Sequence, residues 1–370
     1  MPSHKLTVSL ESRSYSIHIG SGLTKAGGNG ALLPKLRGKQ GVVVTNTTIA
    51  PLYLERVQEW LKAAGYESSA IIIPDGEEYK SHEVLQDLYR KIFESGLQRN
   101  SFVCALGGGV VGDLAGFAAA TYMRGVDLIQ IPTTILAQVD SAIGGKNGVN
   151  LEFGKNLVGT TYQPRVVISD VDFIATLPER ESFCGFGEVV KYALLAGDDF
   201  ISFLEMNHPE IMKQDPRSLA SMTLSCSRIK ADYVVRDEYD LLGVRAVLNL
   251  GHTVGHALEK MYAFQQLAHG EAVAIGLVCA LSLSVTMNLL AESGFQRALQ
   301  LLQLYGLPML VPADADVDEL INIMRRDKKA GRSLSMILLR GLGDPYFEEN
   351  IDAGLLRETL EKCKQPLNIT

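Results

Sequence analysis

The chain has few of the features that mark a secreted, disulfide-stabilised protein. It contains five cysteines in 370 residues, an odd number, and no two of them have C-x-x-C spacing. Such usage is typical of reduced thiols rather than of a disulfide framework. The segment from Met1 to Ile17 has no apolar core of the signal-peptide type. We therefore expect a cytoplasmic protein.

An excess of positive charge is also missing. The formal net charge is -7, with 35 Lys and Arg against 42 Asp and Glu. A general nucleic-acid binder would carry a basic face, so we expect no nucleic-acid partner, and any anionic ligand needs a local cluster of cations. One apolar run, 272–291, is long enough to span a bilayer. Ser282, Ser284, Thr286 and Asn288 dilute it, so it favours a buried helix and no membrane partner.

The length allows two domains with sizeable cores. From Leu6 to about Asp172, strand-like runs alternate with helical ones, which predicts a mainly parallel sheet covered on both faces. The predicted strands are 41–45, 70–73, 102–106, 128–131 and 166–169. From about Leu177 onwards nearly all patterns are helical. The predicted helices are 188–196, 218–235, 254–261, 271–291, 295–304 and 317–325, with one strand at 335–339.

A glycine-rich turn follows the apolar run 102–106. The fingerprint G-x-G-x-x-G matches at Gly107, Gly109 and Gly112, just before a helical pattern. Glycines there allow a phosphate to approach the backbone and the helix N–H groups. The usual acidic residue about 20 positions further on is missing, since Asp127 precedes the next strand. The turn predicts an unusual dinucleotide site, with purely structural glycines as the alternative. Together these patterns predict a Rossmann-like α/β domain over 1–176 and an all-α domain over 177–370.

A carboxylate and imidazoles occur in three short segments that are far apart in the chain. Glu188 follows a glycine, His252 and His256 are four residues apart on a predicted helix, and His269 opens another helical run. Residues four apart on a helix project from one face. One carboxylate with two imidazoles suits zinc or a similar divalent metal with positions left for substrate. The alternative is a set of satisfied polar core residues.

Hydroxyl, amide and ammonium groups are concentrated between the glycine turn and the domain boundary. Thr133 and Thr134 follow a predicted strand, and Lys146 and the pair Lys155-Asn156 follow glycines. Lysines on glycine loops can reach an anion while the backbone supplies N–H groups. This stretch therefore predicts further anion contacts.

These motifs together resemble the 3-dehydroquinate synthases, a family of sugar phosphate cyclases. The resemblance runs in one register from Gly76 to Lys329 and is most specific over 121–125, 140–150 and 248–256. It implies a dehydroquinate synthase-like fold, NAD and Zn2+ or Co2+ as cofactors, and a homodimer.

The family is a carbon–oxygen lyase of the shikimate pathway, which leads to chorismate and the aromatic amino acids. It converts 3-deoxy-D-arabino-heptulosonate 7-phosphate to 3-dehydroquinate and phosphate. NAD oxidises the C5 hydroxyl transiently, phosphate leaves by β-elimination, and NADH returns the hydride. The ring then opens and an intramolecular aldol step closes the carbocycle.

The resemblance also implies roles for individual residues. The implied metal ligands are Glu188, His252 and His269. The implied substrate and catalytic residues are Arg124, Asp140, Lys146, Asn156, Lys191, Lys230, Arg245, Asn249, His256 and Lys329. The implied NAD contacts are Asn46, Asp75, Gly76, Glu77, Glu78, Tyr79, Lys80, Gly108, Gly109, Val110, Val111, Gly112, Asp113, Thr133, Thr134, Lys146, Lys155, Phe173, Ile174, Ala175 and Thr176, with Thr48 beside the adenine.

The chain departs from the family pattern at three places. Asn147 stands where Thr is usual, the segment 237–245 is one residue longer and has Asp240 in place of Glu, and the loop after Lys329 is short. Two other activities remain as alternatives. One is a related cyclase that uses another sugar phosphate, and the other is an iron-type polyol or glycerol-phosphate dehydrogenase.

Overall fold

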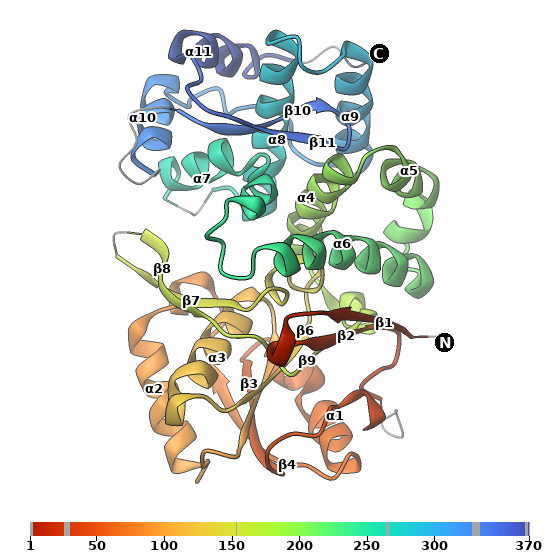
Figure 1. Ribbon diagram of the computed structural model, residues 1–370, viewed down its shortest axis with the longest axis vertical. Coiled ribbons are helices and arrows are strands. Elements are labelled where there is room, and N and C mark those ends of the chain that lie inside the picture. Colours follow the sequence, from red (N-terminus) through yellow and green to blue (C-terminus); the bar gives the residue numbers. More distant parts are fainter. Residues whose placement is uncertain are drawn as a thin grey trace. The chain divides into compact units, whose positions relative to one another are not determined.

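The chain forms two compact units in the computed structural model (Figure 1). The structure describes residues 3–25, 30–152, 154–263, 266–327, 334–366 and 369. The first unit comprises Met1–Leu177 with Gln214–Tyr239, and the second comprises Pro178–Lys213 with Asp240–Thr370. The sequence predicted a single boundary at 176/177. The long segment of the first unit ends at Leu177, and this unit also takes in the later segment Gln214–Tyr239.

A seven-stranded sheet forms the centre of the first unit, in the order β1-β2-β9-β6-β5-β3-β4. Its strands are β1 (His4–Val8), β2 (Tyr15–Gly20), β3 (Gln40–Asn46), β4 (Glu67–Ile73), β5 (Phe102–Gly107), β6 (Asp127–Pro132) and β9 (Val166–Asp170). All neighbours run parallel except β1 and β2. Every residue of β5 and β6 is buried, as expected for strands with both faces covered. The mainly parallel sheet is thereby confirmed.

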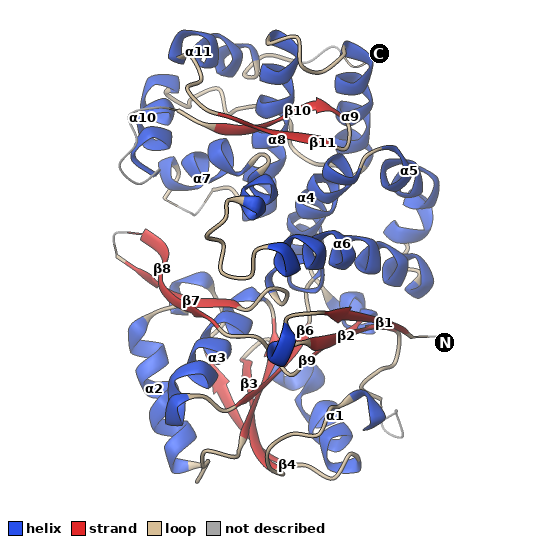
Figure 2. Ribbon diagram, in the orientation of Figure 1, coloured by secondary structure: helices blue, strands red, loops and turns tan. Residues whose placement is uncertain are grey.

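Helices cover the sheet on both faces, as Figure 2 shows for this unit. These helices are α1 (Ala50–Ala63), α2 (His82–Glu94) and α3 (Gly109–Thr121). Val57 and Trp60 of α1 pack in one core with Val43 and Cys104. The helices α2 and α3 pack in a second core, which contains Val103, the neighbour of Cys104 in β5. Because successive strand side chains alternate between faces, these two cores lie on opposite sides of the sheet.

Four further elements complete the first unit. They are the hairpin of β7 (Lys146–Leu151) and β8 (Gly154–Thr161), the short helices η5 (Ala137–Ser141) and η6 (Val171–Thr176), and the helix α6 (Pro216–Arg236). The sequence did not predict the hairpin. It predicted α6 as a helix but placed it in the second domain, whereas α6 contacts β1, β2, η5 and η6.

The second unit is mainly helical, as predicted. Its helices are α4 (Glu179–Ala196), α5 (Asp198–Met212), η7 (Val244–Asn249), α7 (His252–Met261), α8 (His269–Thr286), α9 (Glu292–Leu304), α10 (Val317–Asp327) and α11 (Ala353–Lys362). The predicted strand at 335–339 corresponds to β10 (Met336–Gly341), which pairs with β11 (Asp344–Glu348) in a two-stranded hairpin. The helix α5 and the strand β11 were not predicted.

The helix α8 is the central element of this unit. Among the described residues it is the one helix long and apolar enough to cross a membrane, with a mean hydropathy of 1.5, and 72% of it is buried inside the structure. It contacts α4, α7, α9, α11 and β10. A helix that is apolar all round and covered on all sides is a core helix, which agrees with the interpretation of the run 272–291.

Candidate active site

Three helices of the second unit bring the predicted metal ligands together. Glu188 lies in α4, and His252 and His269 are the first residues of α7 and α8. The Nε2 atoms of both histidines lie 3.3 Å from Glu188 Oε1. One ligand atom from each residue lies within 4.8 Å of the others. The three predicted ligands, which come from separate segments of the chain, therefore lie close enough to share one ion.

Glycines beside the ligands explain this convergence. A Cβ on Gly187 would overlap with the carbonyl oxygen of Gly270, so α4 and α8 touch backbone to backbone next to two of the ligands. Gly251 has a φ of 79°, and a Cβ there would lie 2.9 Å from the backbone nitrogen of Leu277 in α8. Only glycine combines this conformation with so close an approach. The start of α8 is thus pressed against the middle of α4, and the start of α7 against the middle of α8.

The cluster fits a divalent cation. Glu188 is fully buried, and among the described residues neither of its carboxylate oxygens has a hydrogen-bond partner of acceptable geometry. The ion pair with Lys191 offsets part of the cost of this burial, but the unmade hydrogen bonds leave the rest. A cation held by Glu188, His252 and His269 would remove that cost, since carboxylate oxygen and imidazole nitrogen are ligands that zinc accepts.

The outer nitrogens of the two imidazoles face acceptors. His252 Nδ1 lies 3.2 Å from the carbonyl oxygen of Leu250, and His269 Nδ1 lies 3.4 Å from Glu259 Oε2. Burial lowers the pKa of His269, but the carboxylates of Glu188 and Glu259 raise it to about 10. Without metal His269 is therefore doubly protonated at neutral pH, and a cation that takes Nε2 displaces a proton.

Two predicted catalytic residues adjoin the cluster. Lys191 lies one turn after Glu188, is buried, and forms an ion pair with it. Burial raises the pKa of Glu188, but Lys191 and then His252 lower it well below its ordinary value. The His256 ring lies 5.2 Å from that of His252 between centroids. Burial, followed by the charge of His252, lowers the pKa of His256 to about 4, so its imidazole is neutral at neutral pH.

The other predicted substrate residues of this unit belong to or follow η7. Arg245 in η7 is 4% exposed, whereas Asn249 at its end is exposed. Lys329 lies outside the described residues. Glu259 was not among the site residues predicted from the sequence. The signal for it was an acidic residue two turns after His252, on the same face of a predicted helix.

The glycine turn of the first unit joins β5 to α3 as predicted. Among the described residues no side chain caps the start of α3, so its first N–H groups suit an anion. A Cβ on Gly109 would lie 3.3 Å from Ser141 Oγ, and one on Gly108 would lie 3.1 Å from Thr134 Cγ2. Thr133 Oγ1 is buried beside the turn without a hydrogen-bond partner in the described chain. The turn thus combines close packing with unsatisfied donors.

Asp75 and the following segment also lie among their predicted partners. Asp75 accepts hydrogen bonds from Asn46 Nδ2 and Thr48 Oγ1, each at 2.6 Å. It precedes Gly76, whose φ is 131°, and the short helix Glu77–Tyr79, which includes Glu78. This arrangement connects the carboxyl ends of β3 and β4.

Lys80 connects the glycine turn to the β7–β8 hairpin. It is 5% exposed, and its Nζ lies 2.5 Å from Asp113 Oδ2 and 2.6 Å from Asn156 Oδ1. Burial raises the pKa of Asp113, while the charge of Lys80 lowers it, and the net direction is upward. Three predicted site residues from distant segments therefore meet around the buried Lys80 ammonium.

Lys230 of α6 reaches η5. Its Nζ lies 2.9 Å from Asp140 Oδ1 and 2.7 Å from the Asp140 carbonyl oxygen. In the hairpin, Lys146 is exposed and Lys155 is half-buried. Arg124 lies elsewhere, because it precedes β6 while Thr133 follows it. Six residues of strand place the two ends about 20 Å apart, so the structure does not bring Arg124 to the glycine turn of its own chain.

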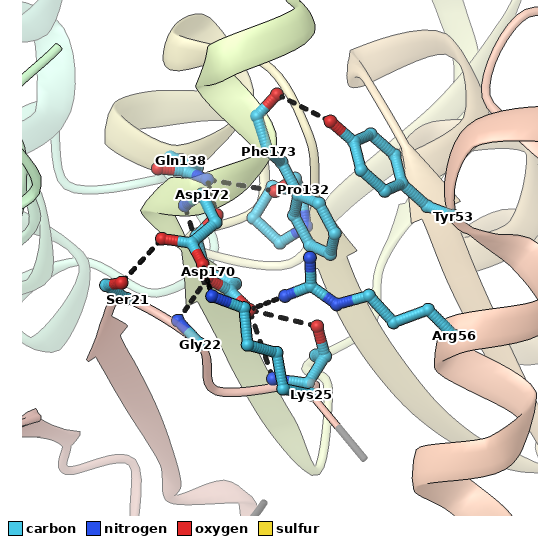
Figure 3. A network of polar contacts seen from close by, with 11 residues as sticks. Ser21, Gly22, Lys25, Tyr53, Arg56, Pro132, Gln138, Asp170, Asp172 and Phe173 are labelled. Carbon is cyan, nitrogen blue, oxygen red and sulfur yellow. Dashed lines mark hydrogen bonds and ion pairs between the residues drawn. The ribbon is translucent and has the colours of Figure 1, made fainter.

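The predicted cofactor loop Phe173–Thr176 forms part of η6 and adjoins a buried network around Asp170, shown in Figure 3. Asp170 accepts hydrogen bonds from the backbone N–H of Gly22 at 2.9 Å and pairs with Arg56 at 2.5 Å. Tyr53 donates to the carbonyl oxygen of Phe173 at 3.3 Å. The side chains of Phe173 and Ile174 are buried and form part of the core. Ala175 is exposed.

The family profile described as "3-dehydroquinate synthase N-terminal" matches residues 70–184, and the profile "3-dehydroquinate synthase C-terminal" matches residues 185–330. The chain belongs to the 3-dehydroquinate synthase family. It is 45% identical over 357 residues to a 3-dehydroquinate synthase of Acidithiobacillus ferrooxidans, covering 96% of this chain and 97% of that one. The family predicted from the sequence is thereby confirmed.

Solved structures of related cyclases share the fold of this family. A 2-deoxy-scyllo-inosose synthase with carbaglucose-6-phosphate, NAD+ and Co2+ has a TM-score of 0.84 and 27% identity, covering 97% of this chain and 100% of that one. A 2-epi-5-epi-valiolone synthase from Streptomyces hygroscopicus subsp. jinggangensis, with NAD+ and Zn2+, has a TM-score of 0.85 and 26% identity, covering 96% and 98%. Both fold predictions, an α/β N-terminal part and a helical C-terminal part, agree with these neighbours.

Proposed function

We propose that this chain converts 3-deoxy-D-arabino-heptulosonate 7-phosphate to 3-dehydroquinate and inorganic phosphate. The observation that carries the proposal is the convergence of Glu188, His252 and His269 beside the buried Lys191, in a chain 45% identical over nearly its full length to 3-dehydroquinate synthases. The related cyclases of known structure are only 26–27% identical. The chain would act as a carbon–oxygen lyase in the shikimate pathway.

The cofactors of the reaction are NAD and Zn2+ or Co2+. The solved cyclases hold NAD+ together with one of these metals, and the residues described above fit both groups. When bound, they supply a reversible hydride acceptor and a Lewis acid at a substrate hydroxyl.

In the second unit, charge and proton transfer fall to residues around the metal ligands. The Lys191 ammonium, buried one turn after Glu188, provides a point charge for an anionic or hydroxyl group of the substrate. The neutral imidazole of His256 can accept a proton and return it. Arg245, Asn249 and Lys329 are assigned to substrate binding by the family resemblance.

In the first unit, the proposed cofactor and substrate contacts follow the carboxyl ends of the parallel strands. In open α/β sheets this edge is the usual place for a ligand. Asp75 and Asn46 would bind the adenosine half of NAD, and Gly109 and Thr133 would bind its phosphates. Lys230, held by Asp140, supplies positive charge for the substrate from α6, as Lys146 and Asn156 do from the hairpin.

We also infer a cytoplasmic homodimer. All five cysteines are free and buried, which suits a reducing compartment. Arg124 is exposed and lies at the amino end of β6, about 20 Å from the carboxyl edge of the sheet. Its proposed contact with substrate would therefore be made in the site of a second copy. Analytical ultracentrifugation of the wild type tests this state, and a monomer at working concentration would contradict it.

The reaction is tested directly with purified chain, the heptulosonate phosphate, NAD and zinc. We expect phosphate and 3-dehydroquinate in equal amounts without net formation of NADH. Lys191→Met should abolish turnover while it keeps the metal content. Steady accumulation of NADH on a polyol substrate would instead indicate a dehydrogenase. Turnover of another sugar phosphate but not of this one would indicate a different cyclase.

A further inference from the structure

The imidazole of His269 lies between two carboxylates from two helices. Its Nε2 is 3.3 Å from Glu188 Oε1 of α4, and its Nδ1 is 3.4 Å from Glu259 Oε2 of α7. Glu259 is only 4% exposed. A buried carboxylate is costly unless it has specific partners, and one partner here is the outer nitrogen of a proposed metal ligand.

We propose that Glu259 is a positioning residue for the metal site. Its carboxylate accepts a hydrogen bond from the Nδ1–H group of His269 and thereby keeps the Nε2 lone pair available for an ion shared with Glu188 and His252. The proposal rests on the function proposed above and adds a residue to that site. A neutral imidazole has one protonated nitrogen, and the hydrogen bond made by one nitrogen decides that the other binds the ion. A carboxylate acceptor also raises the basicity of the ligand.

His252 provides an internal comparison. Its Nδ1 lies 3.2 Å from the carbonyl oxygen of Leu250, a group that can only accept a hydrogen bond. Both histidines are therefore held in the same tautomer, with Nε2 toward Glu188. In one case a backbone carbonyl holds the ring, and in the other a side chain does. Of the two acceptors only Glu259 can be changed by substitution.

The spacing on α7 explains how Glu259 reaches His269. Glu259 follows His252 by seven residues, or two turns, so both side chains project from the same face of α7. That face meets α8, since a Cβ on Gly255, which lies between them, would be 3.1 Å from the carbonyl oxygen of Ala272. His269 opens α8 and is therefore within reach of Glu259 at the far end of this stretch.

A second cation is the competing explanation. Ligand atoms of His256, Glu259 and His269 also lie within 4.8 Å of one another. If His269 bound one ion through each nitrogen, its ring would have to lose both protons, which a neutral imidazole does not do. The number of ions per chain distinguishes the two explanations.

The test compares Glu259→Ala and Glu259→Gln in the full chain, with metal affinity measured by chelator competition and the cobalt-substituted absorption spectrum recorded. We expect Glu259→Ala to bind zinc about 10–100-fold more weakly and to shift the cobalt bands. Glu259→Gln should lose less zinc affinity, because its amide oxygen can still accept a hydrogen bond from Nδ1–H. The matched control is Glu271→Gln. Glu271 lies two residues after His269, but it accepts the Ala268 N–H at 2.7 Å and pairs with Arg180 at 3.0 Å. This variant should keep the wild-type affinity.

Unchanged zinc affinity and an unchanged cobalt spectrum in Glu259→Ala would overturn the proposal. So would two ions per wild-type chain of which Glu259→Ala loses one. If Glu259→Ala does not fold, Glu259→Gln decides by the same two measurements. Neither measurement requires substrate. A chain without synthase turnover whose zinc affinity still depends on Glu259 would contradict the proposed reaction and leave this inference standing.

Discussion

Asn147 occupies the space that any Cβ on Gly116 would need, because a Cβ built there overlaps with Asn147 Oδ1. Asn147 is 7% exposed, and its Nδ2 donates to the carbonyl oxygens of Gly145 and Tyr162 at 2.6 and 3.1 Å. The Asn that stands here in place of the family's usual Thr therefore holds the turn before β7 and abuts α3. Its role is structural, at one of the positions where the chain departs from the family pattern.

Gly116→Ala should therefore destabilise the chain. Helix propensity alone predicts a gain of about 1 kcal/mol for this change, whereas the overlap predicts a loss of about 1–3 kcal/mol. The change in the free energy of unfolding, measured by urea denaturation, shows whether Gly116→Ala stabilises or destabilises the chain. Asn147→Ser in the Gly116→Ala background should recover part of the loss. A Gly116→Ala variant as stable as the wild type would contradict the packing described.

Turnover should depend on the metal held by Glu188, His252 and His269. Chelation is expected to abolish activity, and added zinc or cobalt should restore it. His269→Ala should lower both metal content and rate, because it removes one of three ligands. His82→Ala, an exposed histidine at the start of α2, is the matched control and should change neither. Equal metal content in His269→Ala and wild type would refute the assignment.

Gly109→Val should abolish NAD binding without unfolding the chain. A side chain at this position obstructs the backbone approach of the pyrophosphate at the start of α3. Gly341→Val is the control, since a Cβ there meets nothing within 4 Å. NAD affinity is measured by calorimetry, and the fold by circular dichroism. Wild-type affinity in a folded Gly109→Val chain would place the cofactor elsewhere.

His18 should make the fold less stable in mild acid. It lies in β2 opposite Lys5 of β1 and is 8% exposed. Burial, followed by the charge of Lys5, lowers its pKa below 6.5. Between pH 6.5 and the lower pKa in the folded chain, His18 is protonated in the unfolded chain but not in the folded one. The folded chain therefore loses stability as the pH falls through this range, and the loss stops growing below the folded pKa. The melting temperature of wild type should fall more than that of His18→Gln between about pH 7.5 and 5. Equal decreases would exclude His18 as the cause.

The sequence predicted well those features that depend on short segments. Strands such as 102–106 are continuous apolar runs, and the glycine turn and the helical spacing of His252 and His256 are local patterns. Their placement in the fold followed from the alternation of strand and helix, which restricts the sheet to a parallel arrangement.

Features that depend on distant contacts could not be predicted. The hairpin of β7 and β8 contains Gly148 and Gly154, so its residues resemble loops until they pair. The helix α5 contains Pro209, which weakened its helical pattern. Nothing in the periodicity of α6 shows that it packs with the first unit, and Glu259 becomes significant only once α7 lies against α8.

The glycines beside the proposed ligands have a consequence for how the ion binds. Because the helices that carry the ligands already touch backbone to backbone, the donor atoms have their spacing before an ion arrives. A preorganised site loses little chain entropy on binding, and it does not adjust its shape to one ion in preference to a similar one. The choice between zinc and cobalt then depends on which ion the cell supplies.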